Sequence, residues 1–288
     1  AVKVECLQSG FVILKADGSV AKTNKYAKEQ NIVLENVASS NIVDISATNE
    51  NIVLLDKDLN TYTFGDNKNG QAGIGTTSDK VSLQKVNMIE GKTYFNIGAG
   101  YKNNYIIDTE GFMYGAGSNE YGQLGDSSTT NTSEFVQVTG IPEKVIAITA
   151  GGHSSYALTE SGKVYGWGSN GSGELGQNNT NIYKRPTYLG IDDAIDIAAG
   201  YQSTVVLKKD GTVWMAGLNS DGQLGIESTE SQSTFVQVKN EDGTGYLTNI
   251  KSISAGQYTM FAITNDGEVY GWGENGSGQL GISNTEDQ

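Results

Sequence analysis

Apolar residues in this chain come in short runs, and a turn follows each run. Some runs alternate with polar residues, as in Ile195-Asp-Ile-Ala198, whereas others are apolar throughout, as in Val145-Ile-Ala-Ile148 and Met260-Phe-Ala-Ile263. β-Branched and aromatic residues are frequent in these runs, which is typical of β-strands. No capped stretch long enough for a helix has apolar residues at helical spacing. The pattern predicts an all-β chain of many short strands.

The same order of elements recurs along the chain. Five segments share a glycine-rich string that ends in Gln-Leu-Gly or a close variant, and they are 62–73, 114–125, 165–176, 214–225 and 270–281. An earlier copy keeps the strands and the turn from Val2 to Val20 but loses the glycine-aromatic part. Each copy has a turn at an equivalent position, and the spacing of these turns gives a repeat of about fifty residues. The repeats run approximately over 2–42, 43–93, 94–144, 145–194, 195–249 and 250–288.

Each repeat is predicted to form four strands. Asp-Gly or Ser-Gly pairs between strands two and three predict two-residue hairpin turns with positive φ. Strand three carries the Tyr-Gly-Trp-Gly element, and strand four is exemplified by Phe135-Val-Gln-Val138. One four-stranded sheet cannot bury both of its faces, so sheets repeated in this way fit the blades of a β-propeller. We predict a single domain over 1–288, an all-β β-propeller of six four-stranded blades, with a solenoid as the competing architecture. The leucines expected to lie buried between blades are Leu124, Leu175, Leu224 and Leu280.

Glycine is the unusual feature of the composition, with 38 residues against only 2 prolines. A flexible linker would be rich in both, so the glycines indicate recurring backbone geometry. The 33 acidic and 19 basic residues give a net charge of −14, which disfavours nucleic acid and anionic membranes as partners. No apolar run is long enough for a membrane-spanning helix. The single cysteine, Cys6, can form neither an internal disulfide nor a cysteine-based metal site.

The string Gly-Trp-Gly-x-Asn-x-x-Gly-Gln-Leu-Gly follows an Ala-Gly-x-x-Ser or Ala-Gly-x-x-Thr stretch and an Asp-Gly turn. This combination resembles the repeat of the regulator of chromosome condensation family, and it covers nearly the whole chain. The resemblance implies a propeller, usually of seven blades. The sixth repeat reaches Gln288 before its expected fourth strand. Six blades with a thin last blade are therefore predicted, and a fragment of a seven-bladed propeller is the alternative.

The resemblance also bears on function. The eukaryotic namesake of the family exchanges nucleotide on the small GTPase Ran and binds chromatin, with the help of an inserted hairpin and basic segments. This chain is acidic and its repeats are even in length. Bacterial relatives are often secreted or displayed on the cell surface, and one of them, the propeller-type β-lactamase inhibitor protein, binds its target through aromatic residues on one face. We therefore expect a non-enzymatic protein-binding scaffold of bacterial type, extracellular or at the cell surface, without a cofactor. The alternatives are a carbohydrate-binding surface module and a nucleotide exchange factor for a small GTPase.

The loops between strands one and two are the candidate binding site. They occupy the same place in each repeat, so a propeller would collect them on one face. Tyrosine is a favoured anchor at protein interfaces, and tyrosine with Asn and Gln also suits a glycan. The predicted partner-binding residues are Glu50, Asn51, Tyr101, Lys102, Asn103, His153, Tyr201, Gln202, Gln257 and Tyr258. The alternative is that these tyrosines are ordinary surface residues or pack over the mouth of the channel.

Catalytic and metal-binding interpretations have little support. His153 is the only histidine, and a serine hydrolase would pair it with a serine and a carboxylate. In the family that this chain resembles, His-Ser is common at this position and holds the loop. The acidic residues in turns, such as Asp17 and Asp210, are interpreted as turn formers rather than as metal ligands. The Gly-x-Gly pairs lie in predicted strands and lead to no helix, so no phosphate-binding loop is expected.

Overall fold

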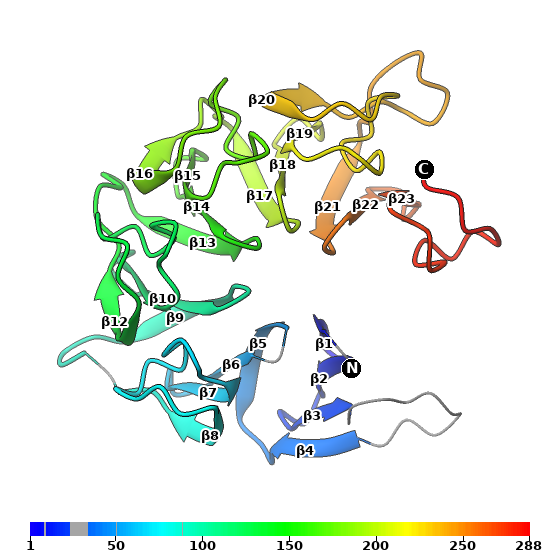
Figure 1. The fold of residues 1–288 in the computed structure, drawn as a ribbon. Coiled ribbons are helices and arrows are strands. Elements are labelled where there is room, and N and C mark those ends of the chain that lie inside the picture. The colour runs from blue at the N-terminus through cyan, green and yellow to red at the C-terminus, as the bar shows by residue number, and fades with distance from the viewer. Residues whose placement is uncertain (9, 24–33, 50, 88) are drawn as a thin grey trace. The chain divides into compact units, whose positions relative to one another are not determined.

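The computed structural model describes residues 1–8, 10–23, 34–49, 51–87 and 89–288. The regular structure of these residues consists of strands, arranged in six consecutive antiparallel sheets, and it includes no helix. In each sheet the strands are neighbours in chain order (Figure 1). Five sheets have four strands and the last has three. The prediction of an all-β propeller with six blades, the last one thin, is confirmed.

The chain divides into two compact units of three blades each. The first comprises residues 1–120 and 128–138, and the second comprises residues 121–127 and 139–288. The strands of the first unit are β1 (Lys3–Leu7), β2 (Gly10–Leu14), β3 (Val20–Thr23), β4 (Leu34–Ala38), β5 (Ile42–Thr48), β6 (Asn51–Asp56), β7 (Thr61–Asp66), β8 (Lys80–Lys85), β9 (Tyr94–Ala99), β10 (Asn103–Asp108), β11 (Met113–Gly117) and β12 (Thr132–Gln137). Those of the second are β13 (Val145–Ala150), β14 (Ser154–Thr159), β15 (Val164–Gly168), β16 (Tyr183–Tyr188), β17 (Ala194–Ala199), β18 (Ser203–Lys208), β19 (Val213–Gly217), β20 (Gln232–Gln237), β21 (Ile250–Ala255), β22 (Thr259–Thr264) and β23 (Val269–Gly273). That residues 1–288 form a single domain stays a prediction.

The hydrophobic cores lie between successive blades. In the second unit, Leu158 and Val164 of the fourth blade pack with Ile197 and Val206 of the fifth. In the first unit, the first strands of neighbouring blades are linked by polar contacts, since the Ser46 hydroxyl accepts a hydrogen bond of 2.9 Å from the Ala99 amide. Within each unit, neighbouring sheets therefore pack against one another, as the propeller prediction requires.

The recurring asparagine of the repeat fixes the loop after strand three. Its side-chain oxygen accepts a hydrogen bond from the backbone amide of the residue five positions later. The Leu175 amide donates to Asn170 and the Leu224 amide donates to Asn219, both at 2.8 Å. This bond aims the leucine into the core. Leu175 and Leu224, like Leu124, have no exposed surface, so their predicted burial is confirmed. Leu280 is only half-buried, and for it the prediction is wrong, because no fourth strand covers it within the described residues.

The hairpins between strands two and three use a different turn from the predicted one. Only the glycine has positive φ, for example 81° at Gly211, and the aspartate before it does not. The Gly211 amide donates to the Lys208 carbonyl at 2.9 Å, and the Lys208 amide donates to the Thr212 carbonyl at 2.9 Å. These bonds define a three-residue loop in which the glycine forms a bulge. Asp210 accepts the Thr212 amide at 3.0 Å, which stabilises the turn.

Leu59 occupies the glycine position of this turn in the second blade, with φ of 62°. A leucine in the left-handed region costs about 1–2 kcal/mol. We expect Leu59→Gly to raise the free energy of unfolding by about 1 kcal/mol, as measured by urea denaturation. Gly267 is the matched control, because its φ is 90° and a Cβ there would meet nothing within 4 Å. Gly267→Leu should therefore lower the free energy of unfolding by a similar amount. If Leu59→Gly and Gly267→Leu changed the free energy of unfolding in the same direction, the positive φ described for these turn positions would be contradicted.

Candidate functional site

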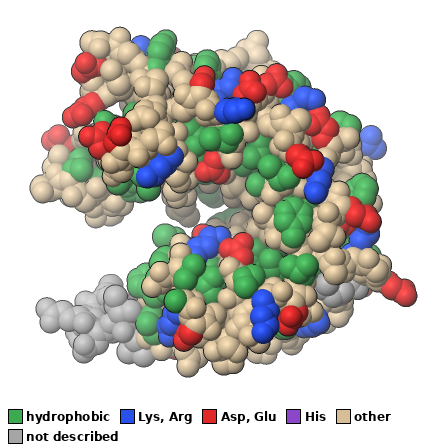
Figure 2. Space-filling model, turned by 180° about the vertical axis from the view of Figure 1, so that it is seen from behind, with side chains coloured by type: hydrophobic (Ala, Val, Ile, Leu, Met, Phe, Trp, Pro, Cys, Tyr) green, Lys and Arg blue, Asp and Glu red, His purple; other side chains and the backbone are tan. Residues whose placement is uncertain are grey.

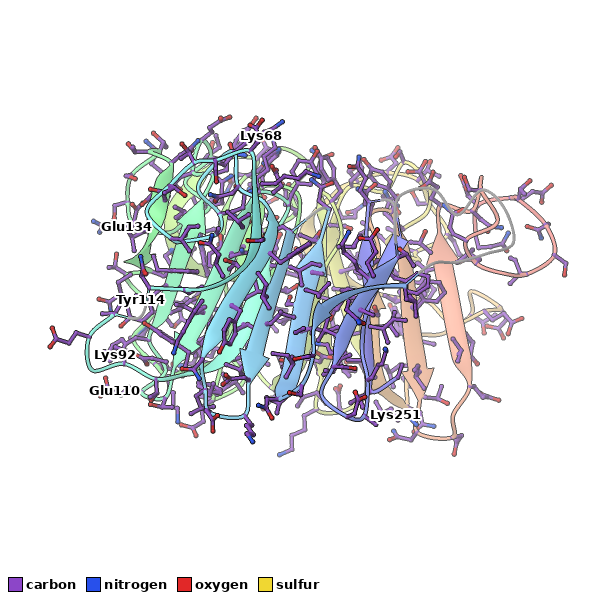
Figure 3. The ribbon with its side chains drawn as sticks, turned by 90° about the horizontal axis from the view of Figure 1, so that it is seen from below. Lys68, Lys92, Glu110, Tyr114, Glu134 and Lys251 are labelled. Carbon is purple, nitrogen blue, oxygen red and sulfur yellow. The ribbon has the colours of Figure 1, made fainter. Side chains whose placement is uncertain are left out.

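The two ends of each blade carry different loops. Because the strands run up and down, the loops between strands one and two lie at the same end as those between strands three and four, and the hairpin turns lie at the other. Figure 3 shows this in the first unit, where Lys68, in the loop after β7, lies at the opposite edge from Lys92 and Glu110. The predicted binding residues therefore belong to the loop end, away from the hairpin turns.

Four aromatic side chains of the second unit form a continuous row at this end. Tyr121 stacks on His153 with ring centroids 4.8 Å apart. His153 contacts Tyr201 edge-on at 6.2 Å, and Tyr201 contacts Tyr258 edge-on at 6.0 Å. All four residues are half-buried, so each keeps part of its surface exposed to solvent. We call Tyr121, His153, Tyr201 and Tyr258 the aromatic row.

Backbone hydrogen bonds between blades hold the row in place. The Gly152 amide donates to the Tyr201 carbonyl at 2.9 Å, and the Tyr201 amide donates to the Gln257 carbonyl at 2.8 Å. The Tyr201 ring lies against the backbone of Gly152, where a Cβ would come within 2.7 Å of it. The loops are therefore ordered before any partner arrives, which lowers the entropic cost of binding.

A second set of bonds ties these loops to their own third strands. The carbonyls of His153, Gln202 and Tyr258 accept the amides of Ser169, Leu218 and Glu274 at 2.9–3.0 Å. The glycine that ends each third strand lets the backbone of the loop come this close to the strand, because it has no side chain in the way. At Gly217, for example, φ is 115°, and a Cβ would overlap the Gln202 carbonyl oxygen.

The structure places the other predicted residues as follows. Gln257 is exposed, and Gln202 is half-buried beside Tyr201 in the same loop. Tyr101 and Lys102 lie in the first unit, with the Lys102 ammonium 5.5 Å from the Tyr101 ring centroid. Glu50 lies outside the described residues.

Asn51 and Asn103 require a correction, because both side chains are buried. Asn51 forms a pair of hydrogen bonds with Asn104, and Asn103 donates to the Tyr105 hydroxyl at 2.9 Å. Both residues begin second strands and hold the sheet, so they are left out of the candidate surface. Tyr121 joins the surface although the sequence prediction missed it. It lies in the glycine-rich string rather than in a loop between strands one and two.

The charged groups that act on Tyr258, at one end of the row, are negative. Burial raises the pKa of the Tyr258 hydroxyl, and the neighbouring Tyr201, Glu274 and Asp221 raise it further. Tyr258 therefore stays neutral and able to donate a hydrogen bond at physiological pH. On the face drawn in Figure 2, acidic and basic side chains are interspersed rather than gathered into separate patches.

Glu174 is a buried carboxyl where the other glycine-rich strings have glutamine. Its side chain accepts the Ser172 amide at 2.9 Å, as Gln223 accepts the Asp221 amide at 2.8 Å. Burial raises the pKa of the Glu174 carboxyl, although hydrogen bonds from its own amide, the Ser172 amide and the Ser169 side chain oppose the shift. A carboxyl whose pKa is higher in the folded state contributes stability below its unfolded pKa of about 4.3, and this contribution is lost as the pH rises through the folded value.

We therefore expect Glu174→Gln to raise the free energy of unfolding by about 1 kcal/mol at pH 7 and to have little effect near pH 4. Urea denaturation at both pH values measures the difference. The matched control is Gln223→Glu, which introduces the carboxyl at the equivalent buried position beside Asp221 and should lower stability at pH 7. An equal effect of Glu174→Gln at both pH values would show that the carboxyl does not titrate as described.

The chemistry around His153 is that of packing. The two serines that follow His153 are buried, and their hydroxyl groups are already hydrogen-bonded within the protein. The Ser155 hydroxyl donates to the Gln123 carbonyl at 3.0 Å, and the Ser154 hydroxyl accepts a hydrogen bond from the Tyr156 hydroxyl at 3.0 Å. Over the part of the chain that the structure describes, no three His, Cys, Asp or Glu side chains are grouped to hold a metal ion. No helix of the described residues is suited to crossing a membrane. That the chain is not an enzyme and has no cofactor stays a prediction.

Family models of the Regulator of chromosome condensation (RCC1) repeat match the chain in two sets of segments. One model matches residues 110–158, 161–207 and 210–263, which together exceed half of the chain. The other matches residues 145–174, 194–223 and 250–279. The chain belongs to the RCC1 repeat family. The string and turn that carry the sequence resemblance thus identified the family correctly.

Known proteins with RCC1 repeats agree with this assignment. The ultraviolet-B receptor UVR8 of Arabidopsis thaliana is 28% identical over 228 residues, which are 78% of this chain and 40% of the receptor. The chain therefore spans well under half of that relative. Human WBSCR16 matches with a TM-score of 0.83 and 21% identity, covering 99% of this chain and 80% of that one. Yeast RCC1 (Prp20), solved with Kap60 bound, matches with a TM-score of 0.84 and 17% identity. The match covers 99% of this chain and 73% of the yeast chain. These structures support the fold, and bacterial origin stays a prediction.

Proposed function

We propose that this chain is a non-enzymatic protein-binding module that binds its partner through the aromatic row. The observation that carries the proposal is the unbroken contact of Tyr121, His153, Tyr201 and Tyr258, which come from four successive repeats and meet at the loop end. Half-buried aromatic residues held side by side offer a partner large apolar area together with polar tips.

The aromatic row suits a protein interface because its residues are of a favourable type and because the backbone beneath them is held by hydrogen bonds. Tyrosine has few rotatable bonds and is enriched among the residues that dominate interface energies. The bonds from Gly152 to Tyr201 and from Tyr201 to Gln257 fix the backbone beneath the rings. Asp221 and Glu274 beside Tyr258 would favour a partner surface that carries Lys or Arg.

One comparison supports a protein as the partner. Yeast RCC1 (Prp20), which shares the fold, is bound to Kap60 in its solved structure. A protein with this fold can therefore bind another protein, although the identity of 17% transfers neither that partner nor its contacts to this chain.

The proposal is tested by quantitative capture from the native source with matched baits. The baits are the parent chain, Tyr201→Ala and Tyr246→Ala. Tyr246 is a 51% exposed tyrosine of the same unit outside the aromatic row. The true partner should be lost with Tyr201→Ala and kept with Tyr246→Ala. Removing an interface anchor costs about 2 kcal/mol, so the purified partner should bind about thirtyfold more weakly to Tyr201→Ala.

Two results would refute the proposal. One is a purified partner that binds the parent chain and Tyr201→Ala equally. The other is a glycan array on which the parent chain binds a defined sugar and loses it with Tyr201→Ala, because the aromatic row with Gln202 and Gln257 would then be a carbohydrate site.

A further inference from the structure

The rings of the aromatic row follow one another at similar distances but do not lie in one plane. His153, Tyr201 and Tyr258 have ring centroids 6.2 and 6.0 Å apart, and their successive ring planes are inclined by 64° and 61°. Tyr121 and His153 are closer, at 4.8 Å, with planes 29° apart. From His153 to Tyr258 the aromatic surface therefore changes direction once per ring, and a ligand that contacts every ring must repeat at this spacing.

The row is not the edge of a strand, which restricts how a ligand can bind. Its members come from four separate loops, with Tyr121 between β11 and β12, His153 between β13 and β14, Tyr201 between β17 and β18, and Tyr258 between β21 and β22. The backbone carbonyls of His153, Tyr201 and Tyr258 already accept hydrogen bonds from amides of the chain itself. A β-ladder needs amides and carbonyls that alternate along one strand. An added strand therefore has no ladder to join here, and a ligand must bind through side chains.

Polar groups of the same loops can donate hydrogen bonds to such a ligand. The Tyr258 hydroxyl is neutral at physiological pH, because burial and nearby negative charges raise its pKa. Gln257 is exposed in the same loop, and Gln202 is half-buried in the loop of Tyr201. Hydroxyl and carboxamide groups donate to carbonyl oxygens. An α-helix uses its carbonyls internally, whereas a polyproline II segment has no internal hydrogen bonds and keeps its carbonyls available. These donors therefore favour a ligand in the polyproline II conformation.

The spacing of the rings fits the same conformation. A polyproline II segment rises about 3.1 Å per residue, so two residues advance about 6 Å, which is the distance between successive rings from His153 to Tyr258. Proline favours this conformation before binding and offers an apolar ring to an aromatic side chain. The backbone beneath the row is also ordered, through the hydrogen bond from the Gly152 amide to the Tyr201 carbonyl at 2.9 Å. Association of two ordered partners loses little conformational entropy.

Negative charge lies at one end of the row. The carboxylates of Asp221 and Glu274 act on the Tyr258 hydroxyl, and both residues are half-buried. The Asp221 carboxylate accepts a hydrogen bond of 2.9 Å from the Ser220 hydroxyl, which restricts its position. A lysine or arginine of the ligand complements these carboxylates, and a basic ligand also suits the net charge of −14.

We propose that the aromatic row binds a proline-rich segment of a partner protein in the polyproline II conformation. The segment spans the row with about six residues, at about two residues per ring, and has a lysine or arginine next to Tyr258. Its prolines pack on the aromatic rings, and its carbonyls accept hydrogen bonds from Tyr258, Gln202 and Gln257. Binding of proline-rich segments to aromatic surfaces is an established mode of peptide recognition. The inference rests on the proposed function, because it specifies the chemistry of the partner at the same surface.

The test titrates a synthetic peptide into the 288-residue chain by calorimetry. The peptide is Arg-Pro-Pro-Pro-Pro-Pro-Pro-Arg with both ends blocked, and its two arginines make the result independent of the direction in which it binds. We expect saturable binding at one site. Tyr201→Ala should weaken binding about thirtyfold, as loss of an interface anchor does. Tyr246→Ala, outside the row, is the matched control and should leave the affinity unchanged.

Tyr258→Ala is a second test of the row, because the Tyr201 ring also packs on the backbone of Gly152 and its loss can disturb the loop. Tyr258 stands at the end of the row, so its removal leaves the ring contacts of Tyr121, His153 and Tyr201 in place. We expect Tyr258→Ala to weaken binding about tenfold. Urea denaturation of each variant shows whether the fold is retained.

Two further peptides test the conformation and the charge. A peptide with glycine in place of every second proline has the same length and charge but little preference for polyproline II, and it should bind about tenfold more weakly. A peptide with glutamine in place of both arginines should bind the parent chain about threefold more weakly. Asp221→Asn should remove most of that threefold difference, because it removes a charge and keeps the shape of the side chain.

Three results would overturn the inference. One is the absence of saturable binding by the proline peptide, and another is equal binding of the proline and glycine peptides. The third is a proline peptide that binds Tyr201→Ala and Tyr258→Ala as tightly as the parent chain, since it would then bind elsewhere. The capture experiment separates these results from failure of the proposed function. A native partner that is lost with Tyr201→Ala, while the proline peptide does not bind, keeps the row as a protein-binding surface and rejects the proline-rich ligand.

Discussion

Gly217→Ala is expected to lower the free energy of unfolding by about 3 kcal/mol or more. Two costs combine at this position. The backbone has φ of 115°, which alanine rarely adopts, and the new Cβ would overlap the Gln202 carbonyl oxygen and lie 2.8 Å from the Ser203 Cα. These neighbours are backbone atoms of β18 and of the loop before it, so no side-chain movement can relieve the overlap.

The measurement is equilibrium urea denaturation of the parent and the variant at the same pH. Gly171→Ala is the matched control, because it lies in the glycine-rich string of the same unit and its Cβ would meet nothing within 4 Å. We expect the control to change stability by about 0.5 kcal/mol or less. If Gly217→Ala were as mild as Gly171→Ala, the close approach of β19 to the loop before β18 would not exist as described.

The strands could be predicted from the sequence because their physical signals are local. Alternation and β-branched residues mark strands such as β17 and β18, and the recurring turn gives their order. The buried leucines also followed from the repeat, since Leu175 and Leu224 occupy the same position after their asparagines. The turn type was wrong, because an Asp-Gly pair suits both a two-residue hairpin and a three-residue loop with a glycine bulge.

The candidate site could be predicted only in part because side-chain direction is not a local property. His153, Tyr201 and Tyr258 come together as the repeat suggests, but Tyr121 reaches His153 from a different loop, and only the packing of the loop 121–127 brings it there. Asn51 and Asn103 stand next to loop residues in sequence, yet they are the first residues of strands and point into the sheet. Position in a repeat therefore located the loops, and three-dimensional contacts decided which of their side chains face outward.

Leu224→Ala is expected to lower the free energy of unfolding by about 3 kcal/mol, whereas the same change at Leu280 should cost about 1 kcal/mol or less. The two leucines occupy the same place in their repeats, and each amide donates to its asparagine, at 2.8 Å from Leu224 and at 3.0 Å from Leu280. They differ in burial. Leu224 is fully buried in a cluster with Val205, Met215 and Trp272, while Leu280 is half-buried.

The two leucines share their residue type, their place in the loop and their hydrogen bond to asparagine. The difference between the two changes in unfolding free energy therefore measures how much the covering strand contributes to the burial of this leucine. Urea denaturation of both variants gives the difference, and equal costs would show that Leu280 is covered in solution.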